Sequence, residues 1–250
     1  MTAPFAGRRI LLTGGAKGIG KAAALRFLDG GATVACLDTD ETALAEMAAA
    51  HGVVALKADV TDTLATNDAV AEAAARLGGL DGVVNSAGVD LQSSLEAMTD
   101  AAWERLMAVN LTGPMKVCRA AAPFLKQAGG GTIVNVSSGA GLQPLKFRSA
   151  YSASKAGLQM FSKALAMELA EAGIRVNVVC PGAVETPLFR SSIGEGAEGE
   201  AQLDAVCARY ALARIADPDE IAAGIAWLTS GDASYVTGVA LAIDGGRTFH

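Results

Sequence analysis

Seven short apolar runs, alternating with longer stretches of helical spacing, constrain the fold of this chain more than any other feature. The runs lie at residues 9–13, 32–37, 53–58, 80–85, 131–137, 174–180 and 238–243, and the longest helical stretches lie at 100–126 and 150–172. Strands that alternate with helices form a parallel sheet, and largely apolar strands fit a sheet covered on both faces. We therefore predict an α/β fold, a doubly wound, seven-stranded parallel sheet with helices on both faces.

The length of the chain suits a single domain. Its 250 residues, 51% of them apolar, can bury one large core, and no repeat calls for a second domain within residues 1–250. One segment differs in composition, because residues 191–200 are rich in Gly and Glu and contain few apolar side chains. We expect this segment to be a mobile loop.

A glycine-rich turn follows the first predicted strand. Gly14, Gly18 and Gly20 form a G-x-x-x-G-x-G pattern that encloses Lys17 and Ile19, and a helical stretch without breakers comes next. Glycines let backbone N–H groups and a helix N-terminus approach a pyrophosphate, so the pattern is a spacing variant of the dinucleotide-binding fingerprint. An ordinary turn between a strand and a helix is the alternative, and the position after the first strand favours the dinucleotide site.

Asp38, at the end of the second predicted strand, indicates which dinucleotide binds. A carboxylate there can accept hydrogen bonds from a ribose diol and repels a 2′-phosphate, which favours NAD over NADP. Lys17 in the glycine turn could instead meet a 2′-phosphate, or it could point to water. We give Asp38 more weight because its repulsion of a phosphate is hard to evade.

The run Tyr-Ser-Ala-Ser-Lys at residues 151–155 places a phenol and an amine on one face of a helix. A nearby ammonium favours the phenolate, and a phenol whose pKa is lowered toward neutral pH can act as a general base on an alcohol. A surface pair on an amphipathic helix is the alternative, and the other motifs of the chain argue against it. We predict that Tyr151 is the base and that Lys155 lowers its pKa.

Further motifs follow one another along the chain. In order they are Thr13-Gly14-x-x-x-Gly18-x-Gly20, Asp59-Val60, Asn85-Ser86-Ala87-Gly88, Asn110, Ser137-Ser138, Tyr151-x-x-x-Lys155, and Pro181-Gly182 leading to Thr186. This ordered set resembles the short-chain dehydrogenase/reductase family over nearly the whole chain, in its single-domain branch. The chain departs from the family at Ser86, where a second Asn is more common. The resemblance implies a Rossmann-like fold and an NAD(P)-dependent oxidoreductase.

The resemblance also implies which residues bind the cofactor. Asp59 would accept a hydrogen bond from the adenine amino group and Val60 would line the ring pocket, although Asp59 could as readily cap a helix. Small residues at the end of the fourth strand would let the backbone lie against the cofactor, which adds Asn85, Ala87 and Gly88. At the nicotinamide end the residues would be Pro181, Gly182, Val184 and Thr186.

Four residues would carry out catalysis by the same resemblance. Ser138, which the family pattern favours over Ser137, would hold the substrate hydroxyl together with Tyr151. Lys155 would also bind the nicotinamide ribose, and Asn110 would return the proton to solvent through a water. The alcohol proton would move to Tyr151 as hydride leaves for NAD. No metal is required, because Ser138 polarises the oxygen and the cofactor carries the electrons.

The substrate is the part of the function that the sequence determines least. The family builds its substrate pocket from loops that include the region at 188–210, which we expect to be flexible. Candidate substrate-binding residues in these loops are Gln92, Gln143, Lys146, Phe147 and Arg190. Their polar groups, with Arg148, suit a sugar, a polyol or a hydroxy acid, and they could equally be solvated loop residues.

Three functions therefore compete. The first is NAD-dependent interconversion of a secondary alcohol and its ketone. The second is NADPH-dependent reduction of a 3-oxoacyl thioester on a carrier protein, against which Asp38 and the net charge of −6 argue. The third is a non-catalytic nucleotide sensor, against which the intact Ser138, Tyr151 and Lys155 argue.

Composition excludes several other classes of protein. The four cysteines, at positions 36, 118, 180 and 207, lack C-x-x-C spacing and the only histidines are His51 and His250, so we expect neither a disulfide framework nor a metal site. The net charge of −6 and the lack of a basic cluster argue against nucleic acid. No apolar stretch is long enough to span a membrane and no signal region is visible, so we expect a cytoplasmic location. The family resemblance implies a homotetramer.

Overall fold

Seven parallel strands form one sheet in the order β3-β2-β1-β4-β5-β6-β7, which confirms the predicted architecture. The computed structural model describes residues 3–194 and 196–248. The strands are β1 (Arg9–Thr13), β2 (Thr33–Asp38), β3 (Val54–Lys57), β4 (Gly82–Asn85), β5 (Gly131–Val136), β6 (Ile174–Pro181) and β7 (Ala240–Ile243). Each lies within about two residues of its predicted position, because apolar runs between turn residues delimit strands well.

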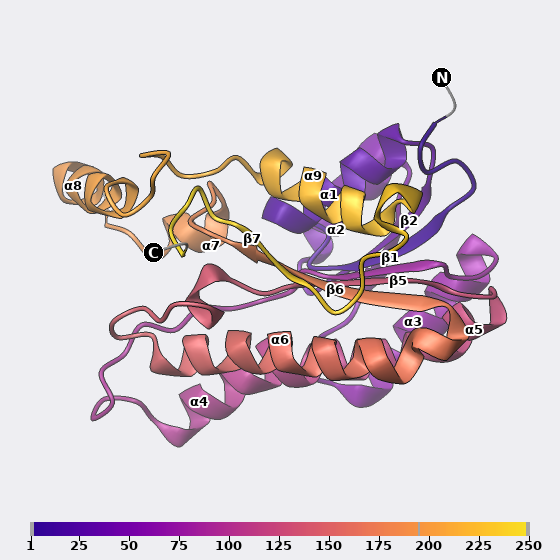
Figure 1. Cartoon of the computed structure of the whole chain (residues 1–250), viewed down its shortest axis with the longest axis horizontal. Coiled ribbons are helices and arrows are strands. Elements are labelled where there is room, and N and C mark those ends of the chain that lie inside the picture. Colours follow the sequence, from indigo (N-terminus) through magenta and orange to yellow (C-terminus); the bar gives the residue numbers. More distant parts are fainter. Residues whose placement is uncertain (1–2, 195, 249–250) are drawn as a thin grey trace.

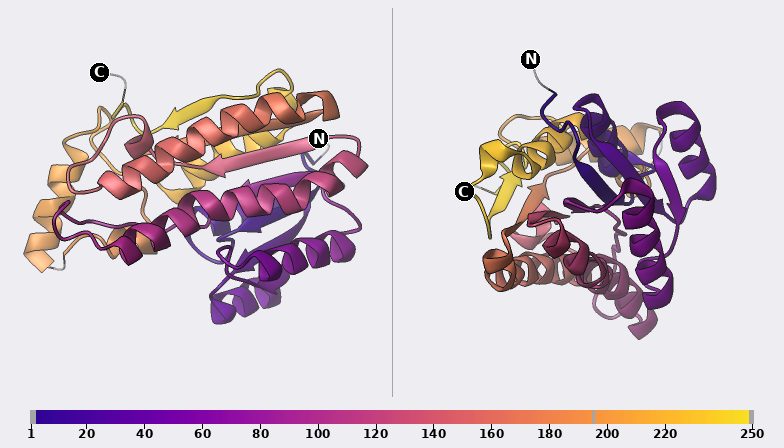
Figure 2. Two further views of the ribbon diagram at one scale, coloured as in Figure 1. Left: turned by 90° about the horizontal axis from the view of Figure 1, so that it is seen from below. Right: turned by 90° about the vertical axis from the view of Figure 1, so that its right-hand side faces the viewer.

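Helices cover both faces of the sheet (Figure 1). They are α1 (Gly18–Asp29), α2 (Glu41–His51), α3 (Thr63–Leu77), α4 (Asp100–Met107), α5 (Gly113–Gln127), α6 (Ser149–Leu169), α7 (Pro187–Arg190), α8 (Gly196–Cys207) and α9 (Pro218–Thr229). Apolar side chains of α1, α2 and α9 pack on one face, and those of α3, α5 and α6 pack on the other. The left view of Figure 2 shows the second of these layers in front of the strands. None of the described helices is long and apolar enough to cross a membrane.

The chain reverses its direction of sheet growth between β1 and β4, which are neighbours in the sheet although β2 and β3 come between them in sequence. Their carboxyl ends lie in register, with Thr13 opposite Asn85. On the other side Thr13 lies opposite Leu37 at the end of β2. At such a reversal the following loops diverge and leave a crevice, which is where ligands of open α/β sheets bind.

The single helix predicted for 100–126 is interrupted in the structure. A π-helical turn, η1 (Ala108–Thr112), separates α4 from α5. Pro114 has no N–H and cannot donate the hydrogen bond that an α-helix would require at the Asn110 carbonyl, so the wider turn falls at this point. The interruption turns the buried Asn110 side chain toward the end of β4, where it bonds to the backbone of Val89.

The prediction of a mobile loop at 191–200 is wrong in part, because residues from Gly196 onward belong to α8. Two features favour a helix there. The Gln202 side chain accepts a hydrogen bond from the Gly194 N–H at 2.9 Å, which ties the preceding segment to the helix. A Cβ at Gly199 would lie 1.9 Å from the Gly194 carbonyl oxygen, so glycine is needed for this close approach rather than for a loop.

Candidate active site

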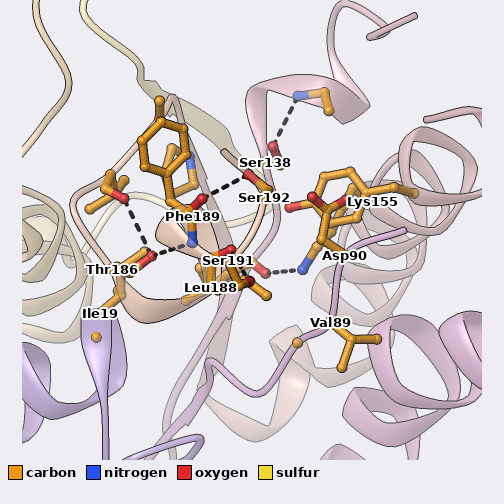
Figure 3. A pocket seen from close by; sticks show the side chains of 18 of the residues that line it. Ile19, Val89, Asp90, Ser138, Lys155, Thr186, Leu188, Phe189, Ser191 and Ser192 are labelled. Atoms are coloured by element: carbon orange, nitrogen blue, oxygen red, sulfur yellow. Dashed lines mark hydrogen bonds between the residues drawn. The ribbon is translucent and has the colours of Figure 1, made fainter. Parts of the chain in front are cut away.

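A cleft of about 860 Å³ lies along the carboxyl ends of the strands, at the reversal between β1 and β4. It is lined by the glycine turn after β1, by the ends of β2, β3 and β4, and by the segments that follow β5 and β6. Figure 3 shows Lys155 and Asp90 on the right of the view and Thr186 and Ile19 on the left, with Leu188, Phe189 and Ser191 between them. The cleft therefore joins the predicted dinucleotide and catalytic residues.

The glycine turn forms one wall of the cleft. Gly14 and Gly18 have φ angles of +64° and +52°, in the left-handed region that favours glycine. A Cβ at Gly14 would lie 2.7 Å from the Ala87 nitrogen, and one at Gly20 would lie 2.0 Å from the Gly14 carbonyl oxygen. The first turn of α1 has no acidic residue and no side-chain cap, so its N–H groups are available to an anion. These features fit the pyrophosphate of a dinucleotide.

Asp38 lies at the next part of the cleft, where β2 ends. Its carboxylate accepts hydrogen bonds from the backbone nitrogens of Ala16 at 3.2 Å and Asp40 at 3.1 Å, which fix its position. Lys17, the alternative partner for a 2′-phosphate, forms an ion pair with Asp40. This pair also raises the pKa of Lys17 through the hydrogen bond to Asp40. The structure thus pairs the cation of the glycine turn with a carboxylate and leaves Asp38 unpaired in the described chain.

Asp59 is not the cap of α3, which resolves the alternative that the sequence leaves open. The cap is Asp62, whose side chain accepts from the nitrogens of Leu64 and Ala65. Asp59 instead accepts from the Thr61 nitrogen at 2.8 Å and from the Arg105 guanidinium at 3.3 Å. Asp59, Arg105 and the buried Val60 all line the cleft, where the predicted adenine site lies.

Asn85 is one predicted cofactor residue that does not line the described cleft. Its side chain is buried, and its Nδ2 donates to Asn135 Oδ1 at 2.8 Å on the neighbouring strand β5. The Asn135 amide in turn donates to Ser162 Oγ on α6 at 2.8 Å. The residues after Asn85 face the cleft as expected, because Ser86, Ala87 and Gly88 line it. Gly20 also lies behind the lining, in contact with Gly14.

Ser138, Tyr151 and Lys155 come together at the inner part of the cleft. Ser138 precedes a short 3₁₀ turn and its Oγ accepts from the Ala140 nitrogen at 3.1 Å. Tyr151 and Lys155 lie on α6, with the ammonium 5.7 Å from the centre of the phenol ring. The ammonium donates to the Val136 carbonyl at 3.0 Å, so the end of β5 holds it in place.

Burial has opposite effects on the two ionisable groups of this site. It raises the pKa of Tyr151, and a hydrogen bond with Ser138 and the charge of Arg148 act in the other direction. Burial lowers the pKa of Lys155 to about 8, from an ordinary value of 10.5. The expectation that Lys155 lowers the Tyr151 pKa is therefore not met by this geometry. The cation that favours the phenolate is Arg148, which precedes α6.

Asn110 connects the π-helical turn to α6. Its Oδ1 accepts from the Val89 nitrogen at 2.9 Å, and its Nδ2 donates to the Val89 carbonyl at 2.9 Å and to Ser154 Oγ at 3.2 Å. A Cβ at Gly88 would lie 3.5 Å from both Asn110 Oδ1 and Lys155 Nζ. Asn110 thus lies behind Gly88, beside the amine of Lys155 rather than on the cleft wall.

The segment after β6 forms the outer wall. Pro181, Gly182, Val184 and Thr186 all line the cleft, as predicted for the nicotinamide end. Thr186 caps α7 by accepting from the Phe189 nitrogen at 3.2 Å, and Ser192 Oγ donates to the Phe189 carbonyl at 2.8 Å (Figure 3). These bonds give the wall a defined local structure between β6 and α8.

Two of the five predicted substrate residues, Gln92 and Lys146, line the cleft. The other three are directed to other contacts. Gln143 does not line the cleft, and its backbone carbonyl accepts a hydrogen bond from the Arg247 guanidinium at 3.0 Å. Phe147 has a φ of +61° and lies 49% exposed beneath the Lys146 ammonium. Arg190 forms an ion pair with Glu185.

Sequence reasoning missed three lining residues near the C-terminus, namely Arg209, Tyr210 and Arg247. None of them belongs to a motif, and although Arg209 and Tyr210 fall within the expected substrate region 188–210, they were not among its candidate residues. The Tyr210 hydroxyl accepts from the Ala183 nitrogen at 2.8 Å, which brings the end of α8 against the segment after β6. We call the part of the cleft lined by Asp90, Lys146, Arg148, Arg209 and Arg247 the substrate end. His250 lies outside the described residues.

A glycine turn at the sheet reversal and a Ser-Tyr-Lys group in the same cleft define a dinucleotide-binding oxidoreductase. Comparison with known proteins agrees. A family model described as enoyl-(acyl carrier protein) reductase matches residues 14–248. The chain is 36% identical to 2,5-dichloro-2,5-cyclohexadiene-1,4-diol dehydrogenase LinX of Sphingobium indicum, over 97% of this chain and 96% of that protein.

Two further proteins extend the comparison. The cis-4-hydroxycyclohexanecarboxylate dehydrogenase of Sinomonas cyclohexanicum is 39% identical, with 98% of each chain covered. The crystal structure of gox2181 superposes with a TM-score of 0.92 at 33% identity, covering 100% of this chain and 98% of that chain. The protein belongs to the short-chain dehydrogenase/reductase family. Its relatives are dehydrogenases, and members of the family use a nicotinamide cofactor.

Proposed function

We propose that the protein is an NAD-preferring dehydrogenase that interconverts a secondary alcohol and its ketone, with Tyr151 as the acid and base. The observation that carries this proposal is the presence of Ser138, Tyr151 and Lys155 in one cleft with the glycine turn. Ser138 and Tyr151 both line this cleft, and the Ser138 hydroxyl acts on the pKa of Tyr151, so one substrate oxygen can contact both hydroxyl groups. The names of the relatives, a diol dehydrogenase and a hydroxy-acid dehydrogenase, support this class of substrate.

The residues divide the reaction between them. In the oxidation Tyr151 Oη takes the proton of the alcohol hydroxyl, while the hydrogen on the carbinol carbon leaves with its electron pair. Bound NAD supplies the acceptor for that hydride. Ser138 orients the substrate oxygen by hydrogen bonding. On the family resemblance we assign Lys155 to the nicotinamide ribose and Asn110 to the path by which the proton leaves.

Reaction rates provide the test of this function. Cofactor reduction is followed with NAD and with NADP against a panel of secondary alcohols that includes cyclohexanols, polyols, sugars and hydroxy acids. We expect turnover of at least one alcohol class, with a higher kcat/KM for NAD. Binding of NADH without turnover of any alcohol or reduction of any matching ketone would refute the proposal and favour a nucleotide sensor.

The preference for NAD is expected to depend on Asp38. In Asp38→Ala the carboxylate that repels a 2′-phosphate is lost, so the ratio of kcat/KM for NAD over NADP should fall at least about tenfold. Lys17→Ala is the matched control, and it should change the ratio far less because Lys17 is paired with Asp40. The reverse result, an unchanged ratio in Asp38→Ala and a large change in Lys17→Ala, would show that Lys17 decides the preference.

The description of the matching family model favours a second candidate, reduction of an acyl thioester on a carrier protein with NADPH. Asp38 argues against NADPH, and the net charge of −6 argues against docking of an acidic carrier. Acetoacetyl-CoA with NADPH serves as the probe. A kcat/KM for this pair above that for every alcohol with NAD would favour the second candidate.

We also propose that the protein is a cytoplasmic homotetramer in which the segment 188–210 contacts the substrate. Met160 and Met167 on α6 are 65% and 82% exposed, and apolar side chains of this kind are commonly covered by a partner copy. Light scattering measures the mass in solution. A mass of one chain would contradict the tetramer.

A further inference from the structure

The charge of the substrate end differs from that of the whole protein. Among the described residues that line it, Lys146, Arg148, Arg209 and Arg247 are cationic and only Asp90 is anionic. The chain as a whole has a net charge of −6. An excess of positive charge inside a cleft of an acidic protein raises the local concentration of anions.

Arg148 is held in a fixed position with part of its guanidinium unused. It forms an ion pair with Asp90, and the two side chains are only 19% and 13% exposed. Asp90 uses its other oxygen to accept from the Leu91 nitrogen at 2.8 Å. The remaining guanidinium contact is long, at 3.5 Å between Nη2 and Gln92 Oε1. Arginine has five N–H donors, so Arg148 can bind a second oxygen ligand while it keeps the pair with Asp90.

Arg209 is placed near Arg148 by its neighbour Tyr210. The Tyr210 hydroxyl accepts from Ala183, and the Leu212 nitrogen donates to the Gly245 carbonyl at 3.1 Å, so the chain on the C-terminal side of Arg209 is fixed. Arg148 and Arg209 both line the cleft, and burial together with the charge of Arg209 lowers the pKa of Arg148. Figure 1 shows α8 and the start of α6 at the same end of the molecule. No described carboxylate pairs with Arg209.

We propose that the substrate end binds a carboxylate of the substrate between Arg148 and Arg209, so that the alcohol oxidised is a hydroxy acid. Apolar residues that also line the cleft, Leu145, Leu188 and Val206, contact the carbon body between the carboxylate and the carbinol carbon. Two guanidiniums without a second carboxylate suit a planar, bidentate anion. This inference names the substrate class of the proposed dehydrogenase and rests on that function for its catalytic arm.

The test compares acids with their neutral esters. We measure kcat/KM with NAD for 3-hydroxybutyrate and 3-hydroxycyclohexanecarboxylate, each beside its methyl ester. The better of the two acids should exceed its ester by more than about tenfold, and Arg209→Gln should reduce that ratio about 10- to 100-fold, the range for a charge-assisted hydrogen bond. Arg209→Lys should recover part of the ratio, because it keeps the charge but loses the planar pair of donors.

Arg119→Gln on α5 is the matched control, since Arg119 is exposed, forms no described ion pair and lies outside the cleft lining. Arg119→Gln changes the net charge of the protein by the same amount as Arg209→Gln. It should leave the acid-to-ester ratio unchanged, because it makes this change outside the cleft. Ester turnover at or above acid turnover in the unaltered protein would overturn the inference. So would an acid-to-ester ratio that Arg209→Gln and Arg119→Gln change by the same factor.

A second arm needs no turnover and separates this inference from the proposed function. Isothermal titration calorimetry measures binding of cyclohexanecarboxylate, and of its methyl ester, to the protein with NADH. Carboxylate binding that Arg209→Gln weakens at least about tenfold supports the inference, even if no alcohol is oxidised and the dehydrogenase proposal fails. Equal binding of the two compounds, or of neither, refutes the carboxylate subsite whatever the enzyme oxidises.

Discussion

At the scale of single residues, burial shifts the pKa values of Tyr151 and Lys155 in opposite directions. The raised pKa of Tyr151 keeps the phenol protonated at neutral pH, the state that the proposed reduction of a ketone requires. The lowered pKa of Lys155, about 8, makes its buried charge costly in the folded protein. On the proposed function, the buried ammonium of Lys155 is retained at a cost in stability.

Replacing the phenol tests the catalytic role directly. Tyr151→Phe should reduce alcohol oxidation by at least about a thousandfold, the upper part of the range for general acid–base catalysis, and leave the Kd for NADH within a few-fold. In the unaltered protein kcat/KM for oxidation should rise with pH beyond neutrality, because the required phenolate forms only as the raised pKa is approached. Oxidation in Tyr151→Phe at a tenth of the original rate or more would reveal a different base.

Replacing the buried amine tests the cost of its charge. Lys155→Met should abolish turnover but raise the free energy of unfolding at pH 7 by about 1–3 kcal/mol, measured by urea denaturation. The folded protein loses the Lys155 proton near pH 8, whereas the unfolded chain keeps it to about 10.5, so folding of the unaltered protein becomes more favourable between these pH values. The advantage of Lys155→Met should therefore shrink from pH 8 upward. A gain that grows with pH would contradict this account.

At the scale of helices and loops, two irregular features shape the cleft. The π-helical turn before α5 directs Asn110 at Val89 and Ser154, which links the loop after β4 to α6. The end of α8 is tied to the segment after β6 by the Tyr210 hydroxyl. Both features join segments that are distant in sequence: the loop after β4 with α6, and the end of α8 with the segment after β6.

The hydrogen bond between the Tyr210 hydroxyl and the Ala183 nitrogen can be tested by removing a single oxygen atom. Tyr210→Phe should raise the KM for the alcohol about threefold to tenfold, because the hydrogen bond that orients the end of α8 is lost. It should change kcat less, since Ser138 and Tyr151 remain. Tyr235→Phe is the matched control, because Tyr235 is fully exposed. The KM values of both variants are measured by steady-state kinetics. The same KM in Tyr210→Phe and in Tyr235→Phe would show that Tyr210 does not position the substrate end.

At the scale of the whole molecule, the two ends of the parallel strands carry different groups of residues. The carboxyl ends of the strands hold the site, and the amino ends hold a charged network. There the Asp81 carboxylate accepts from Arg8 Nε at 2.6 Å and from Arg9 Nε at 3.0 Å, and both of its oxygens lie 3.1 Å from the Arg9 nitrogen. This network joins the starts of β1 and β4, the strands between which the chain reverses.

The division of tasks predicts that stability can be lost without loss of function. Asp81→Ala should lower the free energy of unfolding by about 2–4 kcal/mol, because two guanidiniums and a strand N–H lose a charged partner. The kcat/KM at a temperature well below unfolding should not change, since the cleft lies at the carboxyl ends of the strands and Asp81 at their amino ends. Asp29→Ala at the exposed end of α1 serves as the control in the same denaturation experiment. Equal stability of both variants would argue against a structural role for the network.

The sequence determined the features that depend on neighbours along the chain. The strand and helix alternation, the glycine turn at Gly14 to Gly20, the place of Asp38 and the shared helix face of Tyr151 and Lys155 follow from spacing, because local conformation is set by residues a few positions apart. Boundaries of the strands were predictable for the same reason. These features suffice to predict a dinucleotide fold and its catalytic group.

Only the tertiary structure decided what residues distant in sequence do to one another. It paired Asn85 with Asn135, Lys17 with Asp40 and Arg148 with Asp90. It also brought Arg209 and Tyr210 to the cleft, although no motif surrounds them. The pKa of Tyr151 belongs with these, because burial depends on all the elements packed around the ring. Spacing along a chain fixes the local backbone, but burial and pairing depend on how that backbone is brought together in space.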